Sequence, residues 1–163
     1  MRFEGDFYRL NIPAYSRPHI ARDRIPLYLA GVQKRMVQTT GEVADGLVGH
    51  PLYSRKYLAE FILPQLEIGA KRAGRTREDI DVTTMLITAI SHNREQAIQE
   101  AKNQIAFYAS VKSYESILNL HGWEQQKLAI WEHFKTFNLS KMAAAVTDDM
   151  VEQIAIAGTP DEC

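Results

Sequence analysis

Short apolar runs alternate with longer stretches of helical periodicity through the first half of the chain, and this alternation is what most constrains the fold. The runs cover residues 26–30, which end at Gly31, then 47–49, then 80–90. The last run carries apolar or threonine side chains on both faces, which is typical of a strand that helices cover on both sides. Strands that alternate with helices predict a parallel α/β sheet or barrel.

The stretches between these runs have the three- and four-residue spacing of amphipathic helices. We expect helices over residues 32–44 and 53–73. Pro64 should kink the second helix, because proline lacks an amide hydrogen and crowds the preceding turn. Residues 1–25 lack a sustained period and predict an extended segment or a short hairpin. The side chains expected to face inward from the first helix are Val32, Met36, Val37, Thr40 and Val43.

From Arg94 onward the pattern is helical to near the end of the chain. Asn93 and Thr147 are suited to cap helices, because their side-chain oxygens accept hydrogen bonds from the free amides of a first turn. The expected helical segments cover residues 94–111, 114–120, 124–137 and 148–157. We expect this block to form a helical insertion beside about three parallel strands.

Composition and charge narrow the class of protein. The formal net charge of the 163 residues is -1, whereas a nucleic-acid-binding protein needs a basic face. No apolar run approaches the roughly 20 residues that cross a bilayer, and no signal segment opens the chain. The one cysteine, Cys163, allows neither a disulfide framework nor a thiolate metal cluster. These features predict a cytoplasmic globular protein with no nucleic-acid, membrane or metal partner.

Residues 158–163 have the pattern with which a helix begins. Thr159 is suited to the N-cap, Pro160 to the first turn and Glu162 to a capping box. One helical turn is unstable alone, so we expect the helix to continue past the last residue and residues 1–163 to be a single, partial domain. The alternative is a frayed natural C-terminus.

Several segments, taken in order, carry a resemblance to a known family. Residues 3–8 read F-x-G-x-x-Y, residues 25–32 form a proline-led strand and small-residue turn, and residues 41–46 read GEVADG. Residues 71–75 close a helix with KRAGR, and residues 158–162 begin one with GTPDE. This order resembles the luciferase-like monooxygenase superfamily, over nearly the whole chain but only about the second half of that family's barrel.

The resemblance implies part of a (β/α)8 TIM barrel, with strands five to seven of eight. It implies a coenzyme at the carboxyl-terminal mouth of the barrel, either FMN or 8-hydroxy-5-deazaflavin (coenzyme F-420). The implied reaction is monooxygenation or hydride transfer on a small organic substrate, and the implied class of enzyme is an oxidoreductase that acts on paired donors. Since the coenzyme carries the redox chemistry, no nucleophile–base pair is expected. The chain alone is expected to be inactive, because it holds only part of the barrel.

By the same resemblance, Ala30, Gly31, Val32 and Gln33 would bind the coenzyme through backbone amides near its phosphate tail. Physical chemistry agrees, because a helix N-terminus presents free amides and a positive dipole end to an anion, and glycine permits close approach. Many relatives have Gly-Pro where this chain has Gln33 and Lys34, so the amide donors there depart from that family's usual pattern.

Two histidines follow predicted strands, on the end of a barrel where active sites are built. His50 is the candidate catalytic residue, because imidazole titrates near neutral pH. His92 has the same placement, and for both the alternative is an ordinary loop histidine. Asp45 with Gly46 is open to two interpretations, a carboxylate site or a turn into the next strand.

Two other functions stay open. Three parallel strands leave sheet edges uncovered, so the chain could be a non-catalytic half-barrel that folds only as a homodimer or with a partner chain. Residues 94–157 could instead form a helical interaction module.

Overall fold

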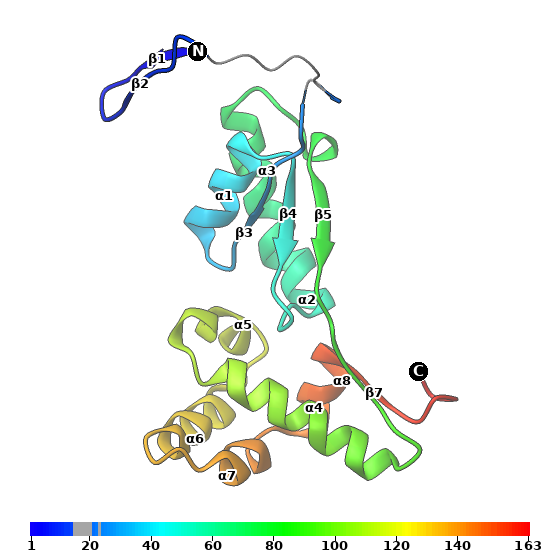
Figure 1. Cartoon of the computed structure of the whole chain (residues 1–163). Helices are drawn as coiled ribbons and strands as arrows, with labels where there is room; N and C mark the ends of the chain where they lie inside the picture. Colours follow the sequence, from blue (N-terminus) through cyan, green and yellow to red (C-terminus); the bar gives the residue numbers. More distant parts are fainter. Residues whose placement is uncertain (15–20, 23) are drawn as a thin grey trace.

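The computed structural model describes residues 1–14, 21–22 and 24–163 (Figure 1). The chain opens with an antiparallel hairpin of β1 (Arg2–Glu4) and β2 (Arg9–Asn11). This confirms the hairpin expected near the N-terminus, although the rest of that prediction falls partly on residues outside the described part.

A parallel sheet follows, as the alternation of strands and helices predicts. Its strands are β3 (Tyr28–Ala30), β4 (Gly46–Gly49) and β5 (Asp81–Thr84), in the order β3-β4-β5. All three strands therefore end at the same edge of the sheet (Figure 1).

The third apolar run is two strands rather than one. β5 is followed by β6 (Ile87–Ile90), which pairs in parallel with β7 (Ala155–Gly158). The first half of the run thus pairs with β4 and the second half with β7. Such an offset between neighbours is the stagger that a barrel requires.

The strand β7 corrects the helix predicted over residues 148–157. The helix α8 (Asp148–Ile154) ends where ladder hydrogen bonds to β6 begin. Residues 155–158 read AIAG and satisfy a helical or an extended pattern equally well. A neighbouring strand, which lies far away in sequence, decides between the two.

The first two predicted helices lie close to their expected positions. They are α1 (Lys34–Val43) and a composite of α2 (Arg55–Tyr57), the π-helical turn η1 (Leu58–Ile62) and α3 (Leu63–Arg72). Pro64 falls in the first turn of α3, where a missing amide hydrogen costs little. The irregularity expected at Pro64 is therefore the π turn immediately before it.

The remaining helices form a block at the other end of the molecule (Figure 1). Asn93 caps α4 (Arg94–Ala109) and Thr147 caps α8, which confirms both predictions. The helix expected over 124–137 ends at Phe134, because Phe137 adopts a left-handed φ of 51°. No helix in the described ranges has the length and hydropathy needed to cross a membrane. The elements of this block are α4, η3 (Lys112–Tyr114), α5 (Glu115–Leu120), α6 (Glu124–Phe134), α7 (Leu139–Ala144) and α8. One further short turn, η2 (Arg77–Asp79), lies outside the block, directly before β5.

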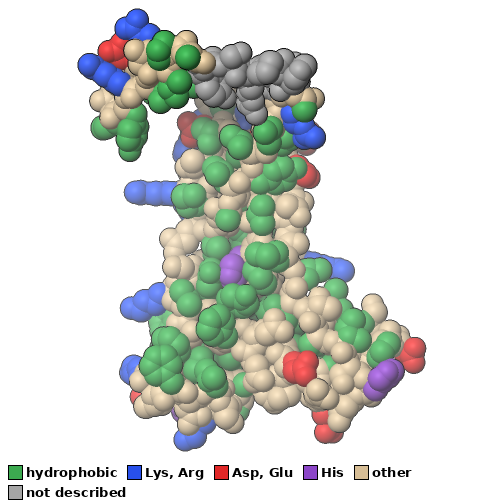
Figure 2. Space-filling view, viewed as in Figure 1, with side chains coloured by type: hydrophobic (Ala, Val, Ile, Leu, Met, Phe, Trp, Pro, Cys, Tyr) green, Lys and Arg blue, Asp and Glu red, His purple; other side chains and the backbone are tan. Residues whose placement is uncertain are grey.

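Helices cover one face of the strands, so the prediction that β5 and β6 are buried on both faces is wrong. The exposed and less exposed residues of these two strands alternate. Figure 2 shows hydrophobic side chains along the column of strands, on the face turned to the viewer. In α1, Val37 and Thr40 are buried as predicted, whereas Met36 and Val43 are exposed.

Helices α1 and α3 cross at contact distance because each has a glycine at the crossing. A Cβ added at Gly69 would overlap the carbonyl oxygen of Gln38, and one added at Gly41 would overlap that of Leu66. This reciprocal contact holds α1 in place, and with it the turn that precedes α1.

We therefore expect Gly69→Ala to lower the free energy of unfolding by about 3 kcal/mol or more, because the methyl group meets backbone that cannot rotate away. The matched control is Gly74→Ala, where φ is +66° but no atom lies within 4 Å of the added Cβ. Its cost should be only the left-handed backbone term of about 1–2 kcal/mol. Equal losses in urea titrations of the two variants would contradict the close crossing.

Candidate functional site

A cavity of about 410 Å³ opens where β3, β4 and β5 end. The carboxyl ends of parallel strands are where α/β proteins build their binding sites. The four residues expected to bind the coenzyme, Ala30, Gly31, Val32 and Gln33, line this cavity together with His50. Its other walls are Met36, Val48, Gly49, Met85, Ser113 and Tyr114.

Two tyrosines hold the turn between β3 and α1. The Tyr53 hydroxyl donates to the carbonyl oxygen of Gly31, and the Tyr57 hydroxyl donates to that of Val32 at 2.8 Å. Both hydroxyls stay protonated, because burial raises the pKa of Tyr53 and of Tyr57 above the usual value. Tyr57 belongs to α2 and Tyr53 lies just before the Ser54 N-cap of that helix, and the two rings are 5.4 Å apart.

The tyrosine contacts set the direction of two amides. In a trans peptide the N–H points opposite to the C=O of the same unit, and the chain has no cis peptide among its described residues. The N–H groups of Val32 and Gln33 therefore point away from the tyrosine hydroxyls. Gly31 itself is buried, and a Cβ there would lie 3.3 Å from the backbone of Met36 and Val37.

The same turn is the uncapped start of α1. Gln33 occupies the N-cap with an extended backbone and makes no side-chain cap hydrogen bond. The first hydrogen bond of the helix runs from the Val37 amide to the Gln33 carbonyl at 3.0 Å, so the amides of residues 34–36 have no acceptor within the helix. Free amides at a positive dipole end suit an anion.

His50 projects from the end of β4 into the same cavity. Its Nδ1 accepts a hydrogen bond from the Leu52 amide at 3.2 Å. Burial lowers the pKa of His50 to about 4, so the imidazole is neutral at physiological pH. Its ring stacks on Tyr114 with 4.0 Å between centroids and meets the edge of Tyr108 at 4.9 Å.

The sequence did not point to the other residues of the cavity, among them Met85, Ser113 and Tyr114. Ser113 and Tyr114 belong to the short turn η3 in the helical block, far from β3 and β4 in sequence. The Gln33 side chain donates to the Ser113 carbonyl at 3.3 Å, which ties η3 to the turn before α1. No local pattern could reveal this contact, because it depends on how the block folds back.

The other sequence candidates lie away from the cavity. Asp45 accepts a hydrogen bond from the Leu27 amide at 2.8 Å and pairs with Arg24, at the opposite end of β4. It therefore stabilises the turn into the strand, which is the second of its two interpretations. His92 is exposed and does not line this cavity.

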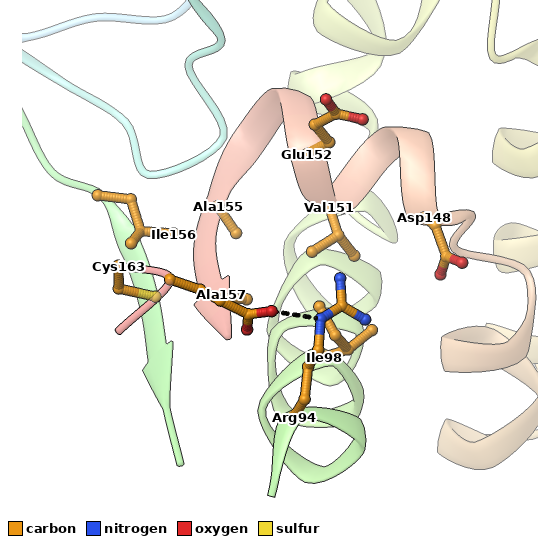
Figure 3. A pocket seen from close by; sticks show the side chains of 10 residues that line it. Arg94, Ile98, Asp148, Val151, Glu152, Ala155, Ile156, Ala157 and Cys163 are labelled. Atoms are coloured by element: carbon orange, nitrogen blue, oxygen red, sulfur yellow. Dashed lines mark hydrogen bonds and ion pairs between the residues drawn. The ribbon is translucent and has the colours of Figure 1, made fainter. Parts of the chain in front are cut away.

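A larger cavity of about 630 Å³ runs along β7, between α4 and α8 (Figure 3). Arg94 points into it and donates from Nε to Glu162 at 3.2 Å (Figure 3). Asp148 and Glu152 also line it, so its acidic groups outnumber its one arginine. An anionic ligand would be repelled there, so the candidate site is the smaller cavity at the carboxyl ends of the strands.

Comparisons with known proteins identify the family. The model of the luciferase-like monooxygenase family matches residues 1–163, so the chain belongs to the luciferase-like monooxygenase family. This confirms the resemblance and the class of fold expected from the sequence.

Individual relatives agree with this assignment. An uncharacterized protein of Mycobacterium tuberculosis is 32% identical, over 98% of this chain and 48% of that protein. The 5,10-methylenetetrahydromethanopterin reductase of Methanopyrus kandleri is 29% identical, over 99% of this chain and 46% of the reductase. The solved structure of the coenzyme F-420-dependent reductase from Methanopyrus kandleri superposes with a TM-score of 0.70 and 31% identity, over 85% of this chain and 39% of that one. The chain thus spans about half the length of the curated relatives it matches.

The lowered pKa of His50 predicts how stability depends on pH. The unfolded chain takes up the proton near pH 6.5 but the folded chain only near 4, so stability should fall as the pH drops through this window. His50→Asn should reduce the fall, measured by urea unfolding at about pH 7 and about pH 4.5. Burial also lowers the pKa of His121, so His121 contributes to the same loss of stability at low pH. Its contribution is equal in the wild type and in the His50→Asn variant, because both proteins contain it. A His50→Asn variant that loses as much stability as the wild type, or no less than a His92→Gln control, would refute this.

Proposed function

We propose that this chain forms the coenzyme-tail site of an oxidoreductase that transfers a hydride to or from a small organic substrate. The family contains enzymes of this kind, and the related Methanopyrus kandleri reductase depends on coenzyme F-420. We therefore propose 8-hydroxy-5-deazaflavin as the coenzyme, with FMN as the alternative. If the coenzyme is instead FMN, the proposed reaction is monooxygenation on paired donors.

The observation that supports this proposal is the direction of the Val32 and Gln33 amides. Tyr53 and Tyr57 hold the carbonyls of the turn, so these two N–H groups are fixed before any ligand arrives. Preorganised donors at a helix start bind a phosphate without a further ordering cost. Lys34 and Arg35 are exposed in the next two positions and add positive charge.

The rest of the cavity suits an uncharged, flat group. Met36, Val48 and Met85 supply apolar walls, and Tyr114 supplies an aromatic one. When bound, the coenzyme would supply the redox chemistry, and the residues of this chain would bind its tail and orient its ring. His50, held neutral, is the side chain placed to donate a hydrogen bond there.

Other expectations remain predictions. Because the chain spans about half the length of its relatives, catalytic activity is proposed for a whole barrel rather than for this chain alone. The single partial domain and the cytoplasmic location rest on the sequence only.

A second function is favoured by the uncovered face of the strands. Leu27, Met85, Leu86 and Ile90 are more than half exposed there. Exposed apolar surface of this extent marks an interaction site, so we propose as the alternative a half-barrel that pairs with a second copy of this chain. Light scattering coupled to gel filtration gives the mass of the particle in solution, and a dimer supports this alternative. A monomer that also unfolds cooperatively on heating contradicts it.

The coenzyme proposal is tested by removing one amide hydrogen. Gln33→Pro deletes the N–H while Gln33→Ala keeps it, and both lose the side-chain contact with Ser113. The proline variant should bind coenzyme F-420 or FMN about tenfold or more weakly than the alanine variant, because a hydrogen bond to a charged group is lost. Fluorescence titration gives the affinities, and circular dichroism checks the fold. Equal affinities of the two variants, or no binding of either coenzyme by the wild type, would count against the proposal.

A further inference from the structure

On the side of the candidate cavity that the helical block forms, the ring of Tyr114 stacks on the imidazole of His50. The rings lie 4.0 Å apart at an interplanar angle of 27°, and the Tyr108 ring meets His50 at 88°. Two tyrosine rings, one from α4 and one from η3, therefore enclose the imidazole. A tilt of the imidazole out of its present plane would break the stack and the edge contact together.

The orientation of the ring decides which nitrogen carries the proton. A backbone N–H can only donate, so the Leu52 amide requires an unprotonated Nδ1 on His50. The neutral imidazole then carries its proton on Nε2. The other tautomer would set two N–H groups against each other, so His50 is held as a donor at Nε2 rather than as a base.

The Nε2 atom is open to the cavity. None of the hydrogen bonds among the described residues engages Nε2, and the described part of the chain holds no buried side-chain nitrogen or oxygen without a partner. His50 lines the cavity, so the exposed Nε2 meets whatever fills it.

We propose that Tyr114 is a positioning residue that locks His50 as a neutral hydrogen-bond donor for a carbonyl oxygen of the ligand in this cavity. The inference rests on the proposed function, because it concerns the ligand of the same site. It gives η3, which lies far from the strands and from the turn before α1 in sequence, a role in the binding site.

The class of acceptor follows from the surroundings. Met36, Val48 and Met85 form apolar walls, so the part of the ligand next to His50 is uncharged. A neutral N–H donor matches a carbonyl oxygen there, whereas a phosphate is better served by the free amides of the turn. The carbonyl belongs either to the coenzyme ring or to a ketone substrate, and the two sources are separated by experiment.

The first measurement is the state of His50 without ligand. In ¹⁵N-labelled protein, the full 163-residue chain should show a protonated Nε2 and an unprotonated Nδ1 on His50 at neutral pH. Tyr114→Phe keeps the stack and should keep this pattern. Tyr114→Leu keeps apolar bulk without the flat ring, so the two tautomers should exchange and the titration of His50 should move toward the ordinary range. If His50 in Tyr114→Leu matches the wild type, or if Tyr114→Phe behaves as Tyr114→Leu does, the positioning role is overturned.

The second measurement adds ligands, with FMN, coenzyme F-420 and cyclohexanone as separate probes. A coenzyme that shifts the Nε2 signal identifies the ring carbonyl, and a shift only with the ketone identifies a substrate. The affinity for the effective probe should fall about three- to tenfold in Tyr114→Leu and be retained in Tyr114→Phe.

The outcomes separate the inference from the proposed function. If a coenzyme shifts the amides of Val32 and Gln33 while no probe moves Nε2, the inference fails and the proposed function stands. If neither coenzyme binds and only the ketone moves Nε2, the coenzyme proposal fails and the donor role of His50 stands. If no probe binds, both fail.

Discussion

The hydroxyls of Tyr53 and Tyr57 hold two carbonyls of the turn between β3 and α1, and the candidate site depends on these two hydrogen bonds. Without them the peptides of Gly31 and Val32 could rotate, and free amides would have no fixed direction. The close crossing of α1 and α3 fixes the other side of the same turn, because α1 cannot slide or tilt against Gly69. A strand end, a helix start and two tyrosines together preorganise a small set of donors.

The cavity lies where the strand–helix part of the molecule meets the helical block, and polar contacts join the two parts there. Tyr57 bonds Ser116 at 2.9 Å, Ser54 bonds His121 at 2.7 Å, and Gln33 reaches η3. Such contacts are directional, so they set the relative position of the two parts more sharply than apolar packing would. The stack of Tyr114 on His50 belongs to this junction, and a ligand in the cavity would touch both parts at once.

The local sequence pattern predicted the elements whose residue types and spacing fit only one kind of structure. The parallel strands, the capping roles of Asn93 and Thr147 and the turn at Asp45 follow from residue types and spacing. What depended on distant neighbours was missed: residues 155–158 become a strand only beside β6, and Met36 lines the cavity instead of joining the core. The turn at Gly31 could be placed in a site by its glycine and its position at a strand end. Tyr114 could not, since nothing near it in sequence marks it as a neighbour of His50.

The most direct test of this account is a crystal structure of the protein with coenzyme F-420 or FMN bound. The account predicts phosphate oxygens within hydrogen-bond distance of the Val32 and Gln33 amides, with both tyrosine hydroxyls still on the carbonyls of the turn. A phosphate bound elsewhere, for example beside Arg94 along β7, or a turn whose carbonyls have swung away from Tyr53 and Tyr57, would contradict it.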